Sequence, residues 1–355
     1  MALRVYIGTY TSGDDEGIFY GDVDINTGAI TIRGNAGGIT SPSYLCLDSK
    51  GENLYAVSEV SDFEGSGALQ SYSVDAASGS LTEMNRQPTG GPGGAGPCHN
   101  TVEANDRYVL TANYGGGSCC IHPIQSDGSL GELTDFKQHE GSSVVESRQQ
   151  GPHGHSINMD PGNHFAFCAD LGLDKVLIYE LDFETGKLNE HGAATVTPGA
   201  GPRHFAFHPN RKFGYVINEI GNTITAYRYN ETAGSLTQMQ EISTIPDDFD
   251  GTTHTADIHL TPNGRYLYGS NRGHDSIAAY SVDGKSGQLS LIQFESVPST
   301  PRNFAIDPSG TWLLSGGQNT DEIASFRIEN DGTLNRTEHV TQVPKPVCLK
   351  FVTLS

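Results

Sequence analysis

Residues 202–219 read PRHFAFHPNRKFGYVINE, and variants of this pattern return along the whole chain. The pattern is a proline, an alternating apolar segment, a short polar turn, and a second apolar segment rich in aromatic residues. Six related stretches begin at Pro42, Pro97, Gly154, Thr255, Pro301 and Pro346. Their starts lie 45 to 57 residues apart, which is a spacing typical of β-propeller blades.

A second alternating segment follows most copies and ends in a Gly-x-Leu turn, as in TITAYRYNETAGSL. Alternation of apolar and polar side chains, with Asp, Asn and Gly between the runs, is typical of short antiparallel strands joined by hairpins. No convincing helix of any length is visible. The last copy, PVCLKFV, supplies one strand, and RVYIGTYTSGDDEGIFYGDVDINTGAI near the N-terminus matches the later strands of a repeat. We therefore predict an all-β, seven-bladed β-propeller, a single domain over residues 1–355, whose ring is closed by N- and C-terminal strands in one blade.

The composition limits the partners that this protein can have. A formal net charge of −21 makes nucleic acid and anionic membrane surfaces poor partners. No apolar run approaches the roughly 18 residues that a membrane span needs, and the N-terminus lacks the pattern of a secretory signal. The 6 cysteines form no CxxC pair, and we expect them to be reduced and mostly buried. These features predict a cytoplasmic protein, and they leave its oligomeric state, monomer or weak dimer, open.

The repeat alignment predicts which residues meet. In each copy the second strand runs back along the first, so the residue after the proline lies beside the end of the second strand. If the first strand is innermost, both positions surround one mouth of a central channel. The first position is occupied by Ser43, Cys98, His155, Arg203, Ala256, Arg302 and Val347. The second is occupied by Glu59, Tyr114, Leu171, Glu219, Arg272 and Gln318, with Tyr10 in the closing blade.

This mouth concentrates charged groups that a blade does not need in order to fold. The concentration indicates a functional site, and its arginines would give an acidic protein a locally positive mouth. The structural alternative is an inter-blade ion pair between Glu219 and Arg203 or Arg272, of a kind that adds little stability. A metal pair formed by His153 and His155 is a further alternative. However, no spacing indicates the third ligand that a catalytic metal needs, so we expect no metal and no cofactor.

The phrases YIGTYTSG, GPRHFAFHPN, SNRGHDSIAAY and PRNFAIDPSG together resemble the seven-bladed propeller lactonases over nearly the whole chain. That family includes propeller-type 6-phosphogluconolactonases and carboxy-cis,cis-muconate cyclase. The resemblance implies hydrolysis of 6-phosphogluconolactone to 6-phosphogluconate, with a small anionic lactone as the partner. It also implies a catalytic set, which is His155, Arg203, Glu219 and Arg272. A muconate-type lactone cycloisomerase and a non-enzymatic binding platform stay open as alternatives.

Lactone hydrolysis needs an activated water and positive charge near the developing oxyanion. His155 and Glu219 are both candidates for the general base, and the sequence leaves the two roles open. Arg203 and Arg272 would bind an anionic group or steady the oxyanion. The candidates for substrate binding are His153, His204, Arg302 and Asn218.

Overall fold

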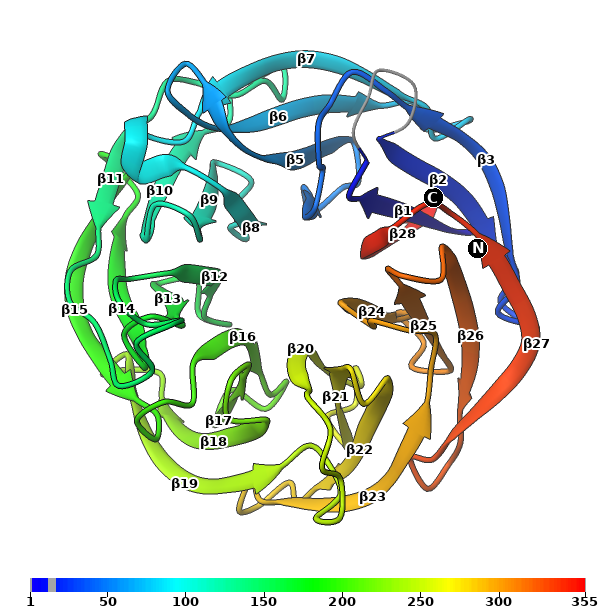
Figure 1. Ribbon diagram of the computed structural model, residues 1–355. Helices are drawn as coiled ribbons and strands as arrows, with labels where there is room; N and C mark the ends of the chain where they lie inside the picture. The colour runs from blue at the N-terminus through cyan, green and yellow to red at the C-terminus, as the bar shows by residue number, and fades with distance from the viewer. Residues whose placement is uncertain (1, 12–16, 355) are drawn as a thin grey trace.

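The computed structural model describes residues 2–11 and 17–354. Its strands form seven four-stranded antiparallel sheets, which stand as blades around one axis (Figure 1). The predicted seven-bladed β-propeller is therefore confirmed. Within the described ranges, the only helical element is the 3-10 turn η1 (Gly91–Gly94), and no helix is long and apolar enough to cross a membrane.

The blades follow the chain order, and the first strand named in each lies nearest the axis (Figure 1). The first blade comprises β4 (Leu45–Leu47), β5 (Asn53–Phe63), β6 (Ser66–Val74) and β7 (Leu81–Pro88). The second comprises β8 (Pro97–Val102), β9 (Tyr108–Asn113), β10 (Ser118–Pro123) and β11 (Asp135–Gln138). The third comprises β12 (Gly154–Met159), β13 (Phe165–Asp170), β14 (Lys175–Asp182) and β15 (Lys187–Thr195).

The next three blades repeat this order. The fourth comprises β16 (Pro202–Phe207), β17 (Phe213–Asn218), β18 (Thr223–Asn230) and β19 (Ser235–Ser243). The fifth comprises β20 (His254–Leu260), β21 (Tyr266–Arg272), β22 (Ser276–Val282) and β23 (Leu289–Ser296). The sixth comprises β24 (Asn303–Ile306), β25 (Trp312–Gly317), β26 (Glu322–Ile328) and β27 (Leu334–Gln342).

The closing blade joins the two ends of the chain, as the repeat pattern predicts. Its inner strand is β28 (Pro346–Leu354), followed by β1 (Ala2–Thr9), β2 (Ile18–Val23) and β3 (Ile30–Ala36). β28 pairs antiparallel with β1. This pairing leaves no open edge between the first and last blades, and an open edge would expose unpaired backbone groups.

A recurring tyrosine explains both the aromatic second strand and the Gly-x-Leu turn of the repeat. The Tyr55 hydroxyl on β5 donates to the Gly128 carbonyl oxygen of the next blade at 2.9 Å. Tyr215 makes the same bond to Gly287 at 2.9 Å. Each is a buried hydrogen bond between neighbouring blades, and bonds of this kind contribute about 1 kcal/mol.

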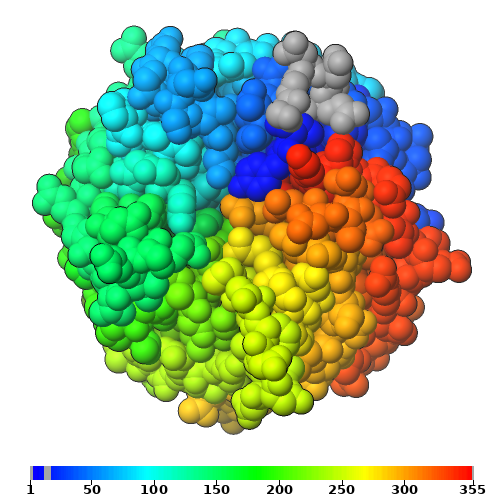
Figure 2. All heavy atoms as spheres, in the orientation of Figure 1, coloured from blue at the N-terminus to red at the C-terminus, as the bar shows by residue number. Residues whose placement is uncertain are grey.

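The inner strands carry an irregularity that positions the site. In β8, β12 and β16 the pairing register shifts after the first residue, so that Cys98, His155 and Arg203 each occupy a β-bulge. A bulge places two residues opposite one and re-aims a side chain, and bulges are common next to active sites. The ring in Figure 1 looks open along its axis, but the space-filling view in Figure 2 shows side chains filling its centre.

Candidate active site

A pocket of about 320 Å³ lies at the mouth where the inner strands begin. Its lining residues are Glu59, Cys98, Tyr114, Arg148, His155, Glu219, His254, Arg272 and Arg302. Seven of these nine residues occupy the two mouth positions that the repeat alignment identifies. Residues from six blades thus converge on one pocket, because the same two repeat positions face the axis in each blade.

Glu219, directly after β17, is the centre of the charge network. Its Oε2 accepts from Arg203 Nε at 3.0 Å and from Arg272 Nη2 at 2.7 Å. Its Oε1 accepts from Arg148 Nη2 at 2.5 Å. Burial alone would raise the pKa of this carboxyl, but the positive charges of Arg272, Arg203 and Arg148 hold it well below the usual 4.5. Glu219 is therefore ionised at neutral pH and is a weak base.

Arg203 lies beneath the pocket and is 2% exposed. Its Nε donates to Glu219, as described above. Its Nη1 donates to the Ala256 carbonyl oxygen at 2.5 Å and lies 3.2 Å from Nε2 of His204. Arg203 is absent from the pocket lining. Its geometry therefore suits holding Glu219 in place better than touching a substrate.

His155 is buried within the bulge of β12 and lines the pocket. Burial, reinforced by the positive charge of Arg203, holds its pKa well below the usual 6.5. Its Nε2 lies 3.7 Å from Glu219 Oε2, and its Nδ1 lies 3.6 Å from the Cys98 sulfur. His155 is therefore a neutral imidazole at physiological pH, which is the form that a general base needs.

Arg302 contributes a cation that the protein itself does not neutralise directly. Its guanidinium lies over the Tyr10 ring, 5.1 Å from the centroid, and the Tyr10 hydroxyl donates to Glu59 at 2.7 Å. Among residues 2–11 and 17–354, no ion pair or side-chain hydrogen bond involves the Arg302 guanidinium. Four arginines and two glutamates in or under one pocket give it a positive charge inside an acidic protein.

The structure turns His204 away from this pocket. Its Nδ1 lies 2.7 Å from Asp257 Oδ1, and burial together with Arg203 lowers its pKa to about 3. His204 lines a different pocket of about 390 Å³, formed by the later residues of the inner strands together with Tyr44 and Lys350. Its ring lies 5.6 Å from the ring of His155, so His204 lies behind the active-site pocket without lining it.

Asn218 and His153 are likewise absent from the lining of this pocket. The Asn218 side chain is fully buried, and its amide donates to the hydroxyls of Thr223 and Thr225, both at 2.9 Å. The His153 ring stacks on Tyr114 at a centroid distance of 4.5 Å. Its Nδ1 lies 2.9 Å from the Tyr114 carbonyl oxygen, so this nitrogen is directed at the backbone of the second blade.

Sequence reasoning missed Arg148 and His254. Arg148 lies in the segment between β11 and β12, outside the repeat pattern, so no alignment of copies could place it. The 57 residues between Pro97 and Gly154, the longest spacing of all, indicate an insertion before the third blade. His254 precedes the aligned position of the fifth blade and pairs with Arg272 across β20 and β21.

Comparisons with known proteins agree over the whole chain. The family described as "Lactonase, 7-bladed beta-propeller" matches residues 4–351. The 6-phosphogluconolactonase of Bacillus subtilis (strain 168) is 38% identical over 349 residues, covering 98% of this chain and 97% of the relative. A crystal structure of a putative 6-phosphogluconolactonase from Bacteroides fragilis superposes with a TM-score of 0.91 at 34% identity, covering 99% and 98% of the two chains. The periplasmic gluconolactonase PpgL of Pseudomonas aeruginosa gives 0.93 at 30% identity, covering 100% of both.

Proposed function

This chain belongs to the seven-bladed β-propeller lactonase family, and from that premise we propose that it hydrolyses 6-phosphogluconolactone to 6-phosphogluconate. The observation that carries the proposal is the pocket that combines neutral His155, ionised Glu219 and a cluster of arginines. A neutral base supplies the activated water, and the arginines suit an anionic substrate. Relatives named 6-phosphogluconolactonase support the choice of lactone.

In the proposed reaction His155 takes a proton from water as the water oxygen attacks the lactone carbonyl carbon. The carbonyl oxygen then carries negative charge, which Arg272 stabilises. Burial lowers the pKa of Arg272 to about 10, so its guanidinium is still charged at neutral pH. The ring oxygen leaves as the tetrahedral intermediate collapses, and the imidazolium of His155 returns the proton to it. Glu219 orients Arg272 and stabilises the imidazolium, because its carboxylate already accepts from three arginines.

The assay that tests this function compares three substrates on the purified protein. These are 6-phosphogluconolactone, the unphosphorylated gluconolactone and a carboxylated muconate, each with and without chelator and corrected for spontaneous reaction. We expect the highest kcat/KM on the phosphorylated lactone. Turnover of the muconate alone would establish the cycloisomerase instead, and no turnover of any substrate would favour a binding platform.

Arg302 is the group that we assign to the substrate phosphate, because it has no ion-pair partner in the described part of the chain. Replacing Arg302 with Gln should raise KM for 6-phosphogluconolactone about 10- to 100-fold, the range expected for losing a charged hydrogen bond. KM for the unphosphorylated lactone should change little. Arg327→Gln, at a surface arginine 58% exposed, is the matched control. Equal losses on both lactones would contradict the phosphate assignment.

The pKa of His155 sets the expected pH dependence. Because its folded pKa lies well below 6.5, the active neutral form persists as the pH falls through 6.5. We therefore expect kcat/KM to stay level from pH 7 down through 6.5 and to decline only at lower pH. A profile of kcat/KM against pH in the acid range measures this dependence, because spontaneous hydrolysis of the lactone is slow there. An acid limb centred at or above pH 6.5 would exclude His155 as the base.

A cytoplasmic location stays a prediction. The 6 cysteines are all buried and unpaired with one another, which suits a reducing compartment. Fractionation of the native host followed by immunodetection would determine the compartment.

A further inference from the structure

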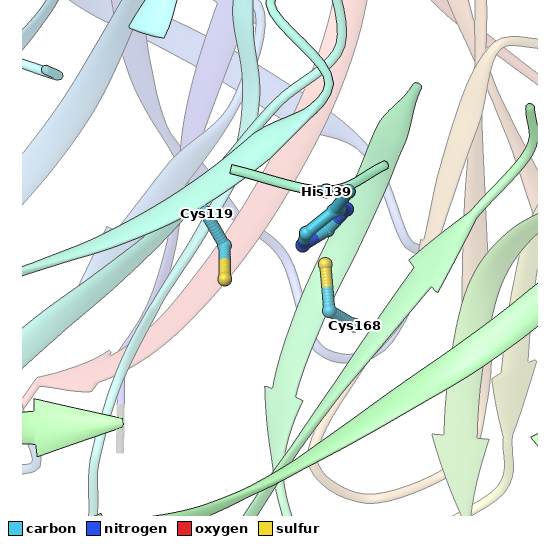
Figure 3. A group of neighbouring side chains, drawn as sticks. All are labelled: Cys119, His139 and Cys168. Atoms are coloured by element: carbon cyan, nitrogen blue, oxygen red, sulfur yellow. The ribbon is translucent and has the colours of Figure 1, made fainter. Parts of the chain in front are cut away.

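Two cysteines and a histidine from separate parts of the chain meet between the second and third blades (Figure 3). Cys119 lies on β10, His139 directly follows β11, and Cys168 lies on β13. One ligand atom from each lies within 4.8 Å of the other two, and Figure 3 shows the side chains pointing toward one another. None of the three lines the active-site pocket. All are buried, with Cys119 and Cys168 at 0% exposure and His139 at 5%.

The orientation of His139 is held by a carboxylate. Its Nδ1 lies 2.6 Å from Oδ2 of Asp170, which is also fully buried. The other ring nitrogen, Nε2, is buried and has no hydrogen-bond partner among the described residues. A carboxylate that binds one nitrogen of a histidine and leaves the other nitrogen for a metal is the usual arrangement around zinc ligands.

We propose that Cys119, Cys168 and Nε2 of His139 form a zinc site that holds the second and third blades together. Thiolate sulfur with imidazole nitrogen is a donor set that selects Zn²⁺ over the oxygen-preferring Mg²⁺ and Ca²⁺. Two thiolates neutralise the charge of one Zn²⁺, which matters where all three ligands are removed from water. The site also accounts for a buried histidine nitrogen that otherwise lacks a partner.

The surroundings of the cluster support this assignment. A pocket of about 490 Å³ is lined by His139 and Tyr179 and offers a path for the ion. Three protein ligands leave one tetrahedral position for a water from this pocket.

The zinc site connects to the active site through Asp170. While Oδ2 binds His139, Oδ1 accepts the backbone N–H of His153 at 2.8 Å and that of Leu173 at 3.1 Å. His153 lies two residues before His155, at the entry to β12. A bound ion would therefore brace the strand start that carries the proposed base, without touching the substrate.

The first test measures metal binding directly. Protein stripped with chelator and kept reduced is incubated with Zn²⁺ or Co²⁺, desalted, and analysed for metal content and for the thiolate-to-cobalt charge-transfer band. We expect about one ion per chain in the wild type and at least a tenfold loss of affinity in Cys119→Ser. Cys120→Ser is the matched control, because Cys120 is the next residue on β10 and is equally buried, yet it is not in the cluster. Absence of bound metal in the wild type, or equal binding in Cys119→Ser, would overturn the proposal.

The second test changes which ring nitrogen of His139 carries the proton and leaves both cysteine thiols in place. In Asp170→Asn the amide donates to Nδ1, so the proton of the neutral ring moves to Nε2, where it competes with the metal. We expect a loss of zinc affinity of about 10- to 100-fold, as is typical for removal of such a partner. At one zinc concentration, zinc should raise the melting temperature of the wild type and of Cys120→Ser by more than that of Asp170→Asn, and circular dichroism checks that each variant folds. A Cys119–Cys168 disulfide in protein purified with reductant, or unchanged affinity in a folded Asp170→Asn, would refute the site.

Discussion

Replacing His155 with alanine should lower turnover of 6-phosphogluconolactone by about 100-fold or more, because the variant loses the only neutral imidazole in the described lining that is both buried and beside Glu219. Loss of a base acts on the chemical step, so the fall should appear in kcat with a smaller change in KM. The measurement is a steady-state assay at neutral pH, corrected for spontaneous hydrolysis.

The control for this experiment is His164→Ala, a histidine exposed at the turn between β12 and β13 of the same blade. Its turnover should equal that of the wild type. If His155→Ala retained turnover within threefold of the wild type, the base would have to be another group. The choice left open by the sequence, between His155 and Glu219, would then need to be reconsidered.

Replacing Glu219 with glutamine should destabilise the fold by about 3–5 kcal/mol, the range for breaking a buried charge pair. The carboxylate accepts from three arginines, and Arg203 among them is 2% exposed and cannot be compensated by water. A glutamine amide would also point an N–H group at one of these donors. Denaturant unfolding of the wild type and the variant measures the difference in free energy of unfolding.

A surface pair provides the comparison for this variant. Glu231 pairs with Arg211 at 3.2 Å with both side chains exposed, so Glu231→Gln should cost less than about 1 kcal/mol.

The pH dependence of the stability difference gives a second check on Glu219. The folded pKa of Glu219 lies below its unfolded value near 4.5, so its contribution is complete above that pH and is lost as the pH falls through the folded pKa. The difference between wild type and Glu219→Gln should therefore shrink in acid. A difference below 1 kcal/mol at pH 7 would contradict the central role of Glu219.

The architecture could be predicted because its signals are local. Alternating side chains and turn residues specify each hairpin within about 20 residues, and the repeat multiplies that signal. The match between the N-terminal strands and the lone C-terminal strand predicted the ring closure, which the pairing of β28 with β1 confirms. The repeat even identified the pocket mouth, because equivalent positions in equivalent blades must face the same axis.

The details of the site depended on features that repeats do not encode. The bulges in β8, β12 and β16 break strict alternation, so the direction of His204 next to Arg203 could not be derived from strand periodicity. Asn218 lies next to the mouth position in the alignment, but its side-chain amide donates hydrogen bonds to the hydroxyls of Thr223 and Thr225. Arg148 reaches Glu219 from an insertion that has no counterpart in other blades.

The amino-acid sequence alone was sufficient for the blade count, the way in which the ring closes, and the family whose chemistry this mouth resembles. The tertiary structure was needed for the low pKa values of His155 and Glu219, because these arise from burial and from arginines in other blades. It was equally needed for the cluster of Cys119, His139 and Cys168, whose members show no metal-binding spacing along the chain. The pairing of strands is determined by residues close together in the sequence. The charge state of a buried group and the ligands of an ion depend on distances that exist only after the blades have packed.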